Sequence, residues 1–256
     1  MPAAPSLSLR ALWRTALWVL VLLVLAGGLI FAAFAQIQYR WNWTGFWPNR
    51  LLFLQGWLTT LGICAGAMII CLVGGFVLML GSRAPWEPVR LACRGYIGLV
   101  RAMPLLVQLL IGYYVVANAL RVHDSILVGM VLLGLFEAAY LAEIFRGALE
   151  SIGQSQREAA RAVGFNTVQM YRYVLVPQAV RRALPGTTGE LVSLVKNSSL
   201  LSVLGIEEIT QITRLINSRS YTALEGFIPL ALAYLAVTLP LSWVAGRLER
   251  RFAYET

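Results

Sequence analysis

The chain has 256 residues, of which 59% are hydrophobic and only 13% are charged, and its formal net charge is +9. Soluble domains carry about 45–50% apolar and about 25% charged residues, so this composition excludes an ordinary soluble domain. It also excludes a disordered chain, which combines low hydrophobicity with high charge. We therefore predict a protein that lies in a bilayer.

Six segments are long and apolar enough to cross the hydrocarbon core, which takes about 20 residues. Four of them contain no charged residue, and a fifth contains Glu137 and Glu143. The sixth contains Glu190 and Lys196 together with helix-breaking residues at 185–189, so we expect an irregular backbone there. In chain order the predicted spans are Leu17–Ala35, Trp57–Gly81, Ala102–Leu120, Ser125–Phe145, Ala183–Ile206 and Gly226–Gly246.

The arginines indicate how these spans are oriented. With the N-terminus in the cytoplasm, 15 of the arginines fall on the cytoplasmic side and 5 on the outer side, while Lys196, the only lysine, falls inside a span. Cytoplasmic loops of membrane proteins are enriched in basic residues. The distribution therefore predicts that both termini, residues 1–16 and 252–256, are cytoplasmic, and it explains the basic charge without a nucleic-acid partner.

The longest predicted cytoplasmic loop has the pattern of two short capped helices. Ser155 and Glu158 fit a capping box at the start of the first helix, and Gly164 can end that helix with a positive φ. Asn166 can cap the second helix, and Pro177 would lie just past its end. We expect this loop to form a structured protrusion.

Four ionisable side chains lie within predicted spans, where a charge near the helix centre costs about 2.5–3.5 kcal/mol. Glu143 is one turn from Arg146, which favours an ion pair. Lys196 has two interpretations: it holds its span against Glu137 or Glu190, or it faces a polar pathway. In the second case a lysine and a glutamate would bind the carboxylate and the amine of a zwitterionic substrate.

Several segments resemble the permeases of ATP-binding cassette importers for polar amino acids. Glu158-Ala-Ala, Gly164 and the Val-Leu-Val-Pro sequence that ends at Pro177 resemble the EAA loop of this family. The flanking segments resemble other motifs of the same permeases: Gly56–Leu61, Arg101–Gln108, Tyr140–Gly147 and Lys196–Leu200.

The resemblance implies an all-α membrane protein with a five-helix type I permease core at about 52–251, plus one additional peripheral helix at 17–35. The coupling loop, at about 150–178, would dock on an ATPase. The implied ATPase-coupling residues are Glu158, Ala159, Ala160, Arg161, Gly164 and Pro177. The residues expected along the substrate pathway are Gln108, Glu137, Tyr140, Glu190, Lys196, Asn197 and Ser198.

The resemblance also implies partners: a second permease subunit of the same or a different chain, two ATP-binding cassette ATPase subunits, and a periplasmic amino-acid-binding protein. The location would be the bacterial inner membrane. The sequence has no G-x-x-x-x-G-K-[ST] loop to bind phosphates, so ATP and Mg are expected on the partner ATPase and no cofactor, metal site or catalytic residue is expected in this chain.

The expected function is therefore the permease subunit of an ATP-driven importer for a polar or charged amino acid, with an acidic one among the options. The alternative, a stand-alone ion-coupled carrier or channel for small solutes, leaves the capped cytoplasmic loop unexplained. An intramembrane enzyme is a third class, but the sequence has no H-E-x-x-H or G-x-S-x-G motif, and its single histidine, His123, lies in a short predicted outer loop.

Overall fold

The computed structural model describes residues 40–222 and 224–252, together with isolated helical positions between residues 13 and 32. The chain divides into two units, Met1–Asn42 and Trp43–Thr256. The predicted span Leu17–Ala35 and the predicted cytoplasmic termini lie largely outside the described residues. The fold below is that of the second unit.

Every regular element in the described part of the second unit is a helix. The α-helices are α2 (Arg50–Gly81), α3 (Glu87–Ala102), α4 (Leu105–Ile111), α5 (Ser125–Glu150), α6 (Gln154–Ala162), α7 (Thr167–Gln169), α8 (Val176–Asn197), α9 (Ile209–Ser220) and α10 (Leu224–Phe252). Short 3-10 helices occupy Trp47–Asn49 and Ser198–Leu204, and π-helical turns occupy Gly112–Ala117 and Met170–Leu175.

Three of these helices are long and apolar enough to cross a membrane by themselves: Trp47–Gly81, Ser125–Glu150 and Leu224–Arg251. A fourth crossing is possible if α3 and the helix that follows it count as one broken span. Three of the predicted spans therefore lie in long apolar helices, as expected for a backbone that must satisfy its own hydrogen bonds in lipid. The predicted span Ala183–Ile206 is not among them.

The predicted span Ala102–Leu120 starts later than expected, because α3 and α4 meet at a bend of 113°. Met103 and Pro104 are extended, with ψ of 146° and 137°, since a proline disfavours the α conformation in the residue before it. The Gln108 amide donates to the carbonyls of Val100 at 2.7 Å and Met103 at 2.9 Å. These bonds satisfy carbonyls at the end of α3. We call residues 101–108 the elbow.

The expected break at 185–189 is wrong. α8 is helical throughout and contains Pro185 in its interior, as membrane helices tolerate when neighbouring groups satisfy the freed carbonyl. The irregular backbone lies further on, in the 3-10 helix that ends at Gly205 with φ +75°. Its serines turn back on the chain: Ser198 donates to the Val195 carbonyl and Ser202 to that of Ser199.

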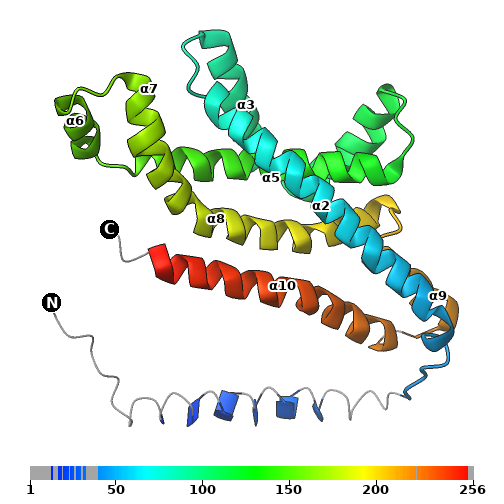
Figure 1. Ribbon diagram of the computed structural model, residues 1–256. Helices are drawn as coiled ribbons and strands as arrows, with labels where there is room; N and C mark the ends of the chain where they lie inside the picture. The colour runs from blue at the N-terminus through cyan, green and yellow to red at the C-terminus, as the bar shows by residue number, and fades with distance from the viewer. Residues whose placement is uncertain are drawn as a thin grey trace. The chain divides into compact units, whose positions relative to one another are not determined.

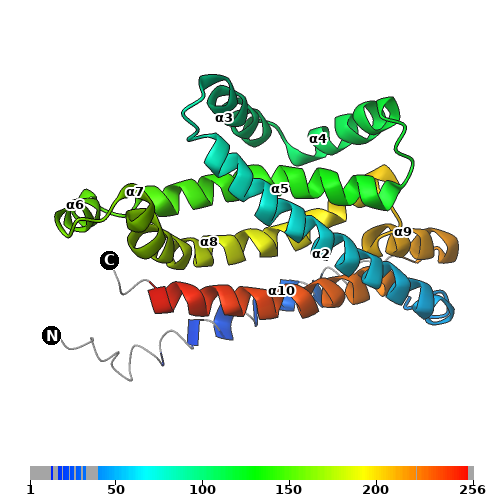
Figure 2. The same cartoon turned by 45° about the horizontal axis from the view of Figure 1, so that its top comes forward.

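The core lies where α2, α5, α8 and the 3-10 helix after α8 meet. α2 crosses α5 in the most extensive helix pair of the unit, and α8 lies between α5 and α10 (Figures 1 and 2). Glycines allow the close approach of α2 and α5. A Cβ atom added to Gly75 would lie 2.8 Å from the Cβ of Leu141, and one added to Gly134 would lie 2.7 Å from the Cβ of Ile70.

Candidate functional site

The loop between α5 and α8 carries α6 and α7 beyond the end of the long helices (Figure 1). We call this the loop end of the unit; the arginine distribution predicts that it is cytoplasmic. The first helix of the loop begins at Gln154. Its N-cap residue is Gly153, so no side chain caps this helix. The predicted capping box of Ser155 and Glu158 is therefore wrong. Because the helix begins before Ser155, the Glu158 carboxylate instead accepts from the Gln154 amide at 2.8 Å.

The expected stop at Gly164 is confirmed. Gly164 has φ +88°, and its N–H donates to the Arg161 carbonyl at 2.9 Å, while the N–H of Phe165 donates to the Ala160 carbonyl at 3.0 Å. This pair of bonds is the Schellman pattern, which satisfies the last carbonyls of a helix and favours glycine at the left-handed position.

The second loop helix has the predicted cap but not the predicted end. The Asn166 side chain accepts from the N–H of Gln169 at 2.9 Å, and the Gln169 side chain accepts from the N–H of Asn166 at 3.0 Å. The helical backbone then continues through the π-helical turn Met170–Leu175 into α8. Pro177 does not follow a helix end; it lies near the start of α8, directly after the π-helical turn.

The predicted coupling residues have two different environments. Glu158, Ala159 and Arg161 are exposed on α6, whereas Ala160 is 5% exposed. Ala160 packs in a small apolar cluster under the loop, with Leu149, Ile152, Met170 and Leu175. The exposed side of α6 is therefore free in this chain to contact a partner, while the buried side fixes the helix to the ends of α5 and α8.

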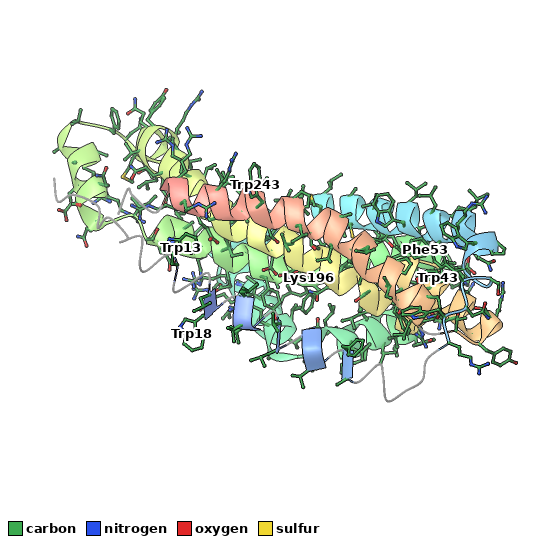
Figure 3. All side chains as sticks on the ribbon, turned by 90° about the horizontal axis from the view of Figure 1, so that it is seen from below. Trp13, Trp18, Trp43, Phe53, Lys196 and Trp243 are labelled. Carbon is green, nitrogen blue, oxygen red and sulfur yellow. The ribbon has the colours of Figure 1, made fainter. Side chains whose placement is uncertain are left out.

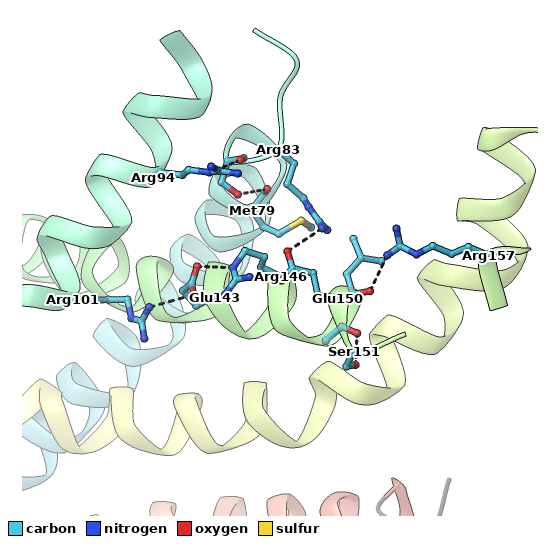
Figure 4. A network of polar contacts seen from close by, with 12 residues as sticks. Met79, Arg83, Arg94, Arg101, Glu143, Arg146, Glu150, Ser151 and Arg157 are labelled. Atoms are coloured by element: carbon cyan, nitrogen blue, oxygen red, sulfur yellow. Dashed lines mark hydrogen bonds and ion pairs between the residues drawn. The ribbon is translucent and has the colours of Figure 1, made fainter. Parts of the chain in front are cut away.

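Two arginines outside the predicted set of coupling residues fasten the loop to α5. Arg182 on α8 donates to the Ser151 carbonyl at 2.6 Å and to its hydroxyl at 3.0 Å. Arg157 on α6 donates to the Leu149 carbonyl at 3.5 Å (Figure 4). The carbonyls at the end of a helix carry partial negative charge, so cations near them are favourable. The sequence carries no local signal for these contacts, because Arg157 and Arg182 lie 8 and 31 residues from the carbonyls that they reach.

A second group of candidate residues meets in the middle of the unit. Glu137 on α5 is fully buried, and its Oε1 accepts from the Asn197 amide at 2.8 Å. Its Oε2 is buried without a hydrogen-bond partner among the described residues, and the carboxyl group of Glu190 on α8 lies close enough to interact with it. The structure thus brings three predicted pathway residues together, two of them acidic.

Lys196 is not part of this buried group. Its side chain is exposed and makes no ion pair among the described residues. Of the two interpretations of Lys196, the pairing with Glu137 or Glu190 is therefore wrong. The side chains of consecutive helical residues point about 100° apart. Because Asn197 points toward α5, the side chain of Lys196 points away from α5. Lys196 lies between Trp43 at one end of the unit and Trp243 toward the other (Figure 3).

The remaining predicted pathway residues support neighbouring elements. Ser198 is fully buried, and the amide of Gln108 holds the elbow, as described above. The Tyr140 ring packs on Phe136 with a centroid distance of 5.1 Å and lies under the guanidinium group of Arg101 at 5.7 Å. The expected ion pair of Glu143 with Arg146 is confirmed.

The unit also contains an apolar cavity of about 290 Å³ between α2, α5 and α8 near the loop end. Its walls are apolar except for Thr187, and they include Phe76, Leu149 and Val180. A zwitterion needs partners for both of its charges, because an unpaired charge in an apolar site is very costly. This cavity is therefore not a site for a free amino acid, and the candidate polar site remains the group around Glu137.

The all-helical unit, its elbow and its capped loop can now be compared with known proteins. The family described as "Binding-protein-dependent transport system inner membrane component" matches residues 78–254. The chain belongs to this family. It is a transport permease subunit and a membrane protein with several spans.

Relatives of this permease match along most of its length. It is 34% identical over 220 residues to the glutamine transport system permease protein GlnP of Escherichia coli (strain K12), which covers 83% of this chain and 98% of GlnP. It is 37% identical over 213 residues to the octopine transport system permease protein OccM of Rhizobium radiobacter, covering 79% of this chain and 84% of OccM. The glutamate/aspartate import permease protein GltK of Escherichia coli O157:H7 is 29% identical over 224 residues, covering 84% of this chain and all of GltK.

Solved structures confirm the permease fold. The crystal structure of an amino acid ABC transporter with histidines matches with a TM-score of 0.77 and 30% identity, over 83% of this chain and 100% of that chain. The MetNI methionine ABC transporter, in inward-facing conformations, matches with a TM-score of 0.67 and 21% identity, over 80% of this chain and 98% of that chain. The second match concerns the fold alone. The expected fold class, an ABC importer permease, is therefore confirmed.

Proposed function

We propose that this permease is the membrane subunit of an ATP-driven importer for a polar or charged amino acid in a bacterial inner membrane. The observation that carries the proposal is the 34% identity to a glutamine permease over nearly the whole of that protein. Relatives named for glutamate and aspartate, and for octopine, support an amino acid or a derivative of one as the substrate.

The loop end provides the contact with the energy source in this proposal. α6 presents Glu158, Ala159 and Arg161 to the outside and is held at the ends of α5 and α8 by Ala160. A partner ATPase that moves α6 would therefore move both long helices. Two ATPase subunits with ATP and Mg, a second permease subunit, and a periplasmic binding protein complete the proposed importer.

The substrate pathway in this proposal passes the polar group around Glu137. Ionisable residues inside membrane proteins are costly and usually face a pathway or a partner. Lys196 is an exposed cation without an ion pair among the described residues, and Glu190 is a half-buried anion on the same helix. Lys196 would bind the carboxylate of an amino acid on the exposed side of α8, and the group of Glu137, Glu190 and Asn197 would lie along another part of the pathway.

The test is purification of the tagged chain from its native membrane, identification of its subunits by mass spectrometry, and reconstitution into proteoliposomes. We expect an ATPase to copurify and radiolabelled amino acids to accumulate only with internal ATP and the binding protein. Glutamine, glutamate, aspartate and histidine form the first panel of substrates. Uptake by the chain alone, driven by an ion gradient and insensitive to ATP, would instead establish the stand-alone carrier.

A further inference from the structure

Five charged side chains form a chain of ion pairs at the loop end of α5, which we call the charge ladder (Figure 4). Arg101 from the elbow pairs with Glu143 at 3.3 Å, and Glu143 pairs with Arg146 at 2.8 Å. Arg146 also pairs with Glu150, and Glu150 pairs with Arg83 at 3.1 Å. The order is therefore Arg–Glu–Arg–Glu–Arg, with each carboxylate between two guanidinium groups.

The ladder has permanent and separable contacts. Glu143, Arg146 and Glu150 all lie on α5, one turn apart, so their contacts persist whenever α5 is helical. Arg146 donates to both carboxylate oxygens of Glu143, from Nε at 2.9 Å and from Nη2 at 2.8 Å. If Arg101 moves away, Glu143 keeps its two hydrogen bonds, and no unpaired carboxylate is left behind.

The two end contacts of the ladder differ in their access to water, because Nη1 of Arg83 is buried. The side chains of Arg101 and Arg83 are 45% and 30% exposed. Exposed ion pairs contribute little net stability because solvent replaces the lost partner. Arg101 can therefore leave and regain α5 at small cost, whereas the three central groups of the ladder cannot leave it.

The two end contacts of the ladder attach both ends of α3 to α5. Arg83 lies in the turn before α3, and Arg101 lies in the last turn of α3 and is the first residue of the elbow. The loop is fastened to the same end of α5 by Arg157 and Arg182, as described above. A displacement of α6 therefore reaches α3 and the elbow through one short stretch of α5.

We propose that Arg101 is a positioning residue of the transport cycle: its ion pair with Glu143 couples the elbow to movements of the loop. The pair forms in one conformational state and opens in another, while Glu143 stays on Arg146. The inference rests on the proposed function, because the movement it transmits is the one that ATP hydrolysis drives at the loop. The ion pair connects two of the motifs found in the sequence, Arg101–Gln108 and Tyr140–Gly147.

The first test uses the complete transporter in proteoliposomes and measures amino-acid uptake and ATP hydrolysis in the same vesicles. We expect Arg101→Met to lower the ratio of uptake to hydrolysis by at least about threefold, within the range of coupling effects in other proteins. Arg101→Lys keeps the charge and should restore most of the ratio. Arg90→Met is the matched control, since Arg90 lies on the same helix but pairs with Glu87 of that helix, at 3.5 Å.

The second test measures the separation of α3 and α5 directly. Spin labels at Leu99 and Gly147, both exposed, would be placed in the full complex after replacement of Cys64, Cys71 and Cys93. We expect two distances in the wild type, exchanged by nucleotide, and a distance that no longer responds to nucleotide in Arg101→Met.

An unchanged ratio in Arg101→Met overturns the inference, and so does a lower yield of complexes whose ratio is normal, because Arg101 would then act only in assembly. A wild-type complex that hydrolyses ATP but accumulates no amino acid contradicts the proposed function instead. In that case the distance between Leu99 and Gly147 still decides whether the pair opens with nucleotide.

Discussion

Asn197 and Lys196 are neighbours in the chain, but their side chains have different surroundings. Asn197 donates to the buried carboxylate of Glu137, and Lys196 is exposed without an ion pair among the described residues. Ser198, the next residue, bonds its own helix. A polar motif of three residues therefore divides into one internal bond, one exposed cation and one buried hydroxyl.

Lys196→Met tests the exposed cation. We expect assembly and ATP hydrolysis to remain normal, since no described anion loses a partner, and amino-acid uptake at low substrate concentration to fall about tenfold or more. That magnitude corresponds to the loss of a hydrogen bond to a charged group. The measurement is the initial uptake rate in proteoliposomes as a function of substrate concentration. Normal uptake by a normal complex would remove Lys196 from the pathway.

Asn197→Ala provides the contrast at the neighbouring residue. It leaves a buried carboxylate without its donor, which costs about 1–3 kcal/mol or more. Thermal unfolding of the purified complex should therefore shift to lower temperature in Asn197→Ala and not in Lys196→Met. Equal stability of the two variants would contradict the assignment of different surroundings.

At the scale of elements, the loop depends on one backbone conformation. α6 is terminated by Gly164, which has φ +88°, and α7 begins three residues after that glycine, behind the Asn166 cap. The direction in which α6 is presented is thus fixed by a left-handed residue and a capping box, both made from local sequence.

Gly164→Val tests this element. A β-branched residue in the left-handed region costs about 1–3 kcal/mol of backbone strain, so we expect α6 to lose its orientation and the complex to lose ATPase association or stimulated hydrolysis. Copurification of the ATPase and its activity with substrate and binding protein are the measurements. Gly153→Ala is the matched control in the same loop, because Gly153 has φ −56°. Full activity of both Gly164→Val and Gly153→Ala would show that the loop has no role in coupling.

Local sequence predicted the elements unequally. The stop at Gly164 and the cap at Asn166 were predicted because both rest on bonds within a few residues. The break predicted at Pro185 was wrong because the effect of a proline depends on its surroundings. A proline that ends a helix in water is tolerated inside a packed membrane helix. The contact of Gln108 with the end of α3 needed the 113° bend, which no residue pattern specified.

At the scale of the whole molecule, the long helices were predictable because the bilayer restricts the backbone to few structures. Long apolar runs formed α2, α5 and α10, since lipid leaves a spanning backbone only its own hydrogen bonds. The arrangement of these helices was not predictable from periodicity. The pair of Glu137 with Asn197 and that of Arg101 with Glu143 join distant segments, and only the packed structure brings them together.

The close approach of α2 and α5 gives a prediction for the stability of the unit. Gly134→Val places a side chain 2.7 Å from Ile70 and 3.0 Å from the backbone oxygen of Ala67. Overpacking of this kind costs about 1–3 kcal/mol, so we expect a lower thermal unfolding temperature and lower yield. Gly62→Val on α2 is the control, because a Cβ there meets nothing within 4 Å. Equal stability of the two variants would show that the helices separate easily.

The same glycine contacts set an order of events during synthesis. Gly75 contacts Leu141, and Ile70 contacts Gly134. Roughly 65 further residues therefore have to leave the ribosome before α2 can pack against α5. At about 5–20 residues per second this delay is roughly 3–13 s. During that interval the glycine side of α2 faces lipid or an insertion factor. A nascent chain arrested before α5 should therefore remain bound to the insertion machinery, and one arrested after α5 should be released as a packed pair.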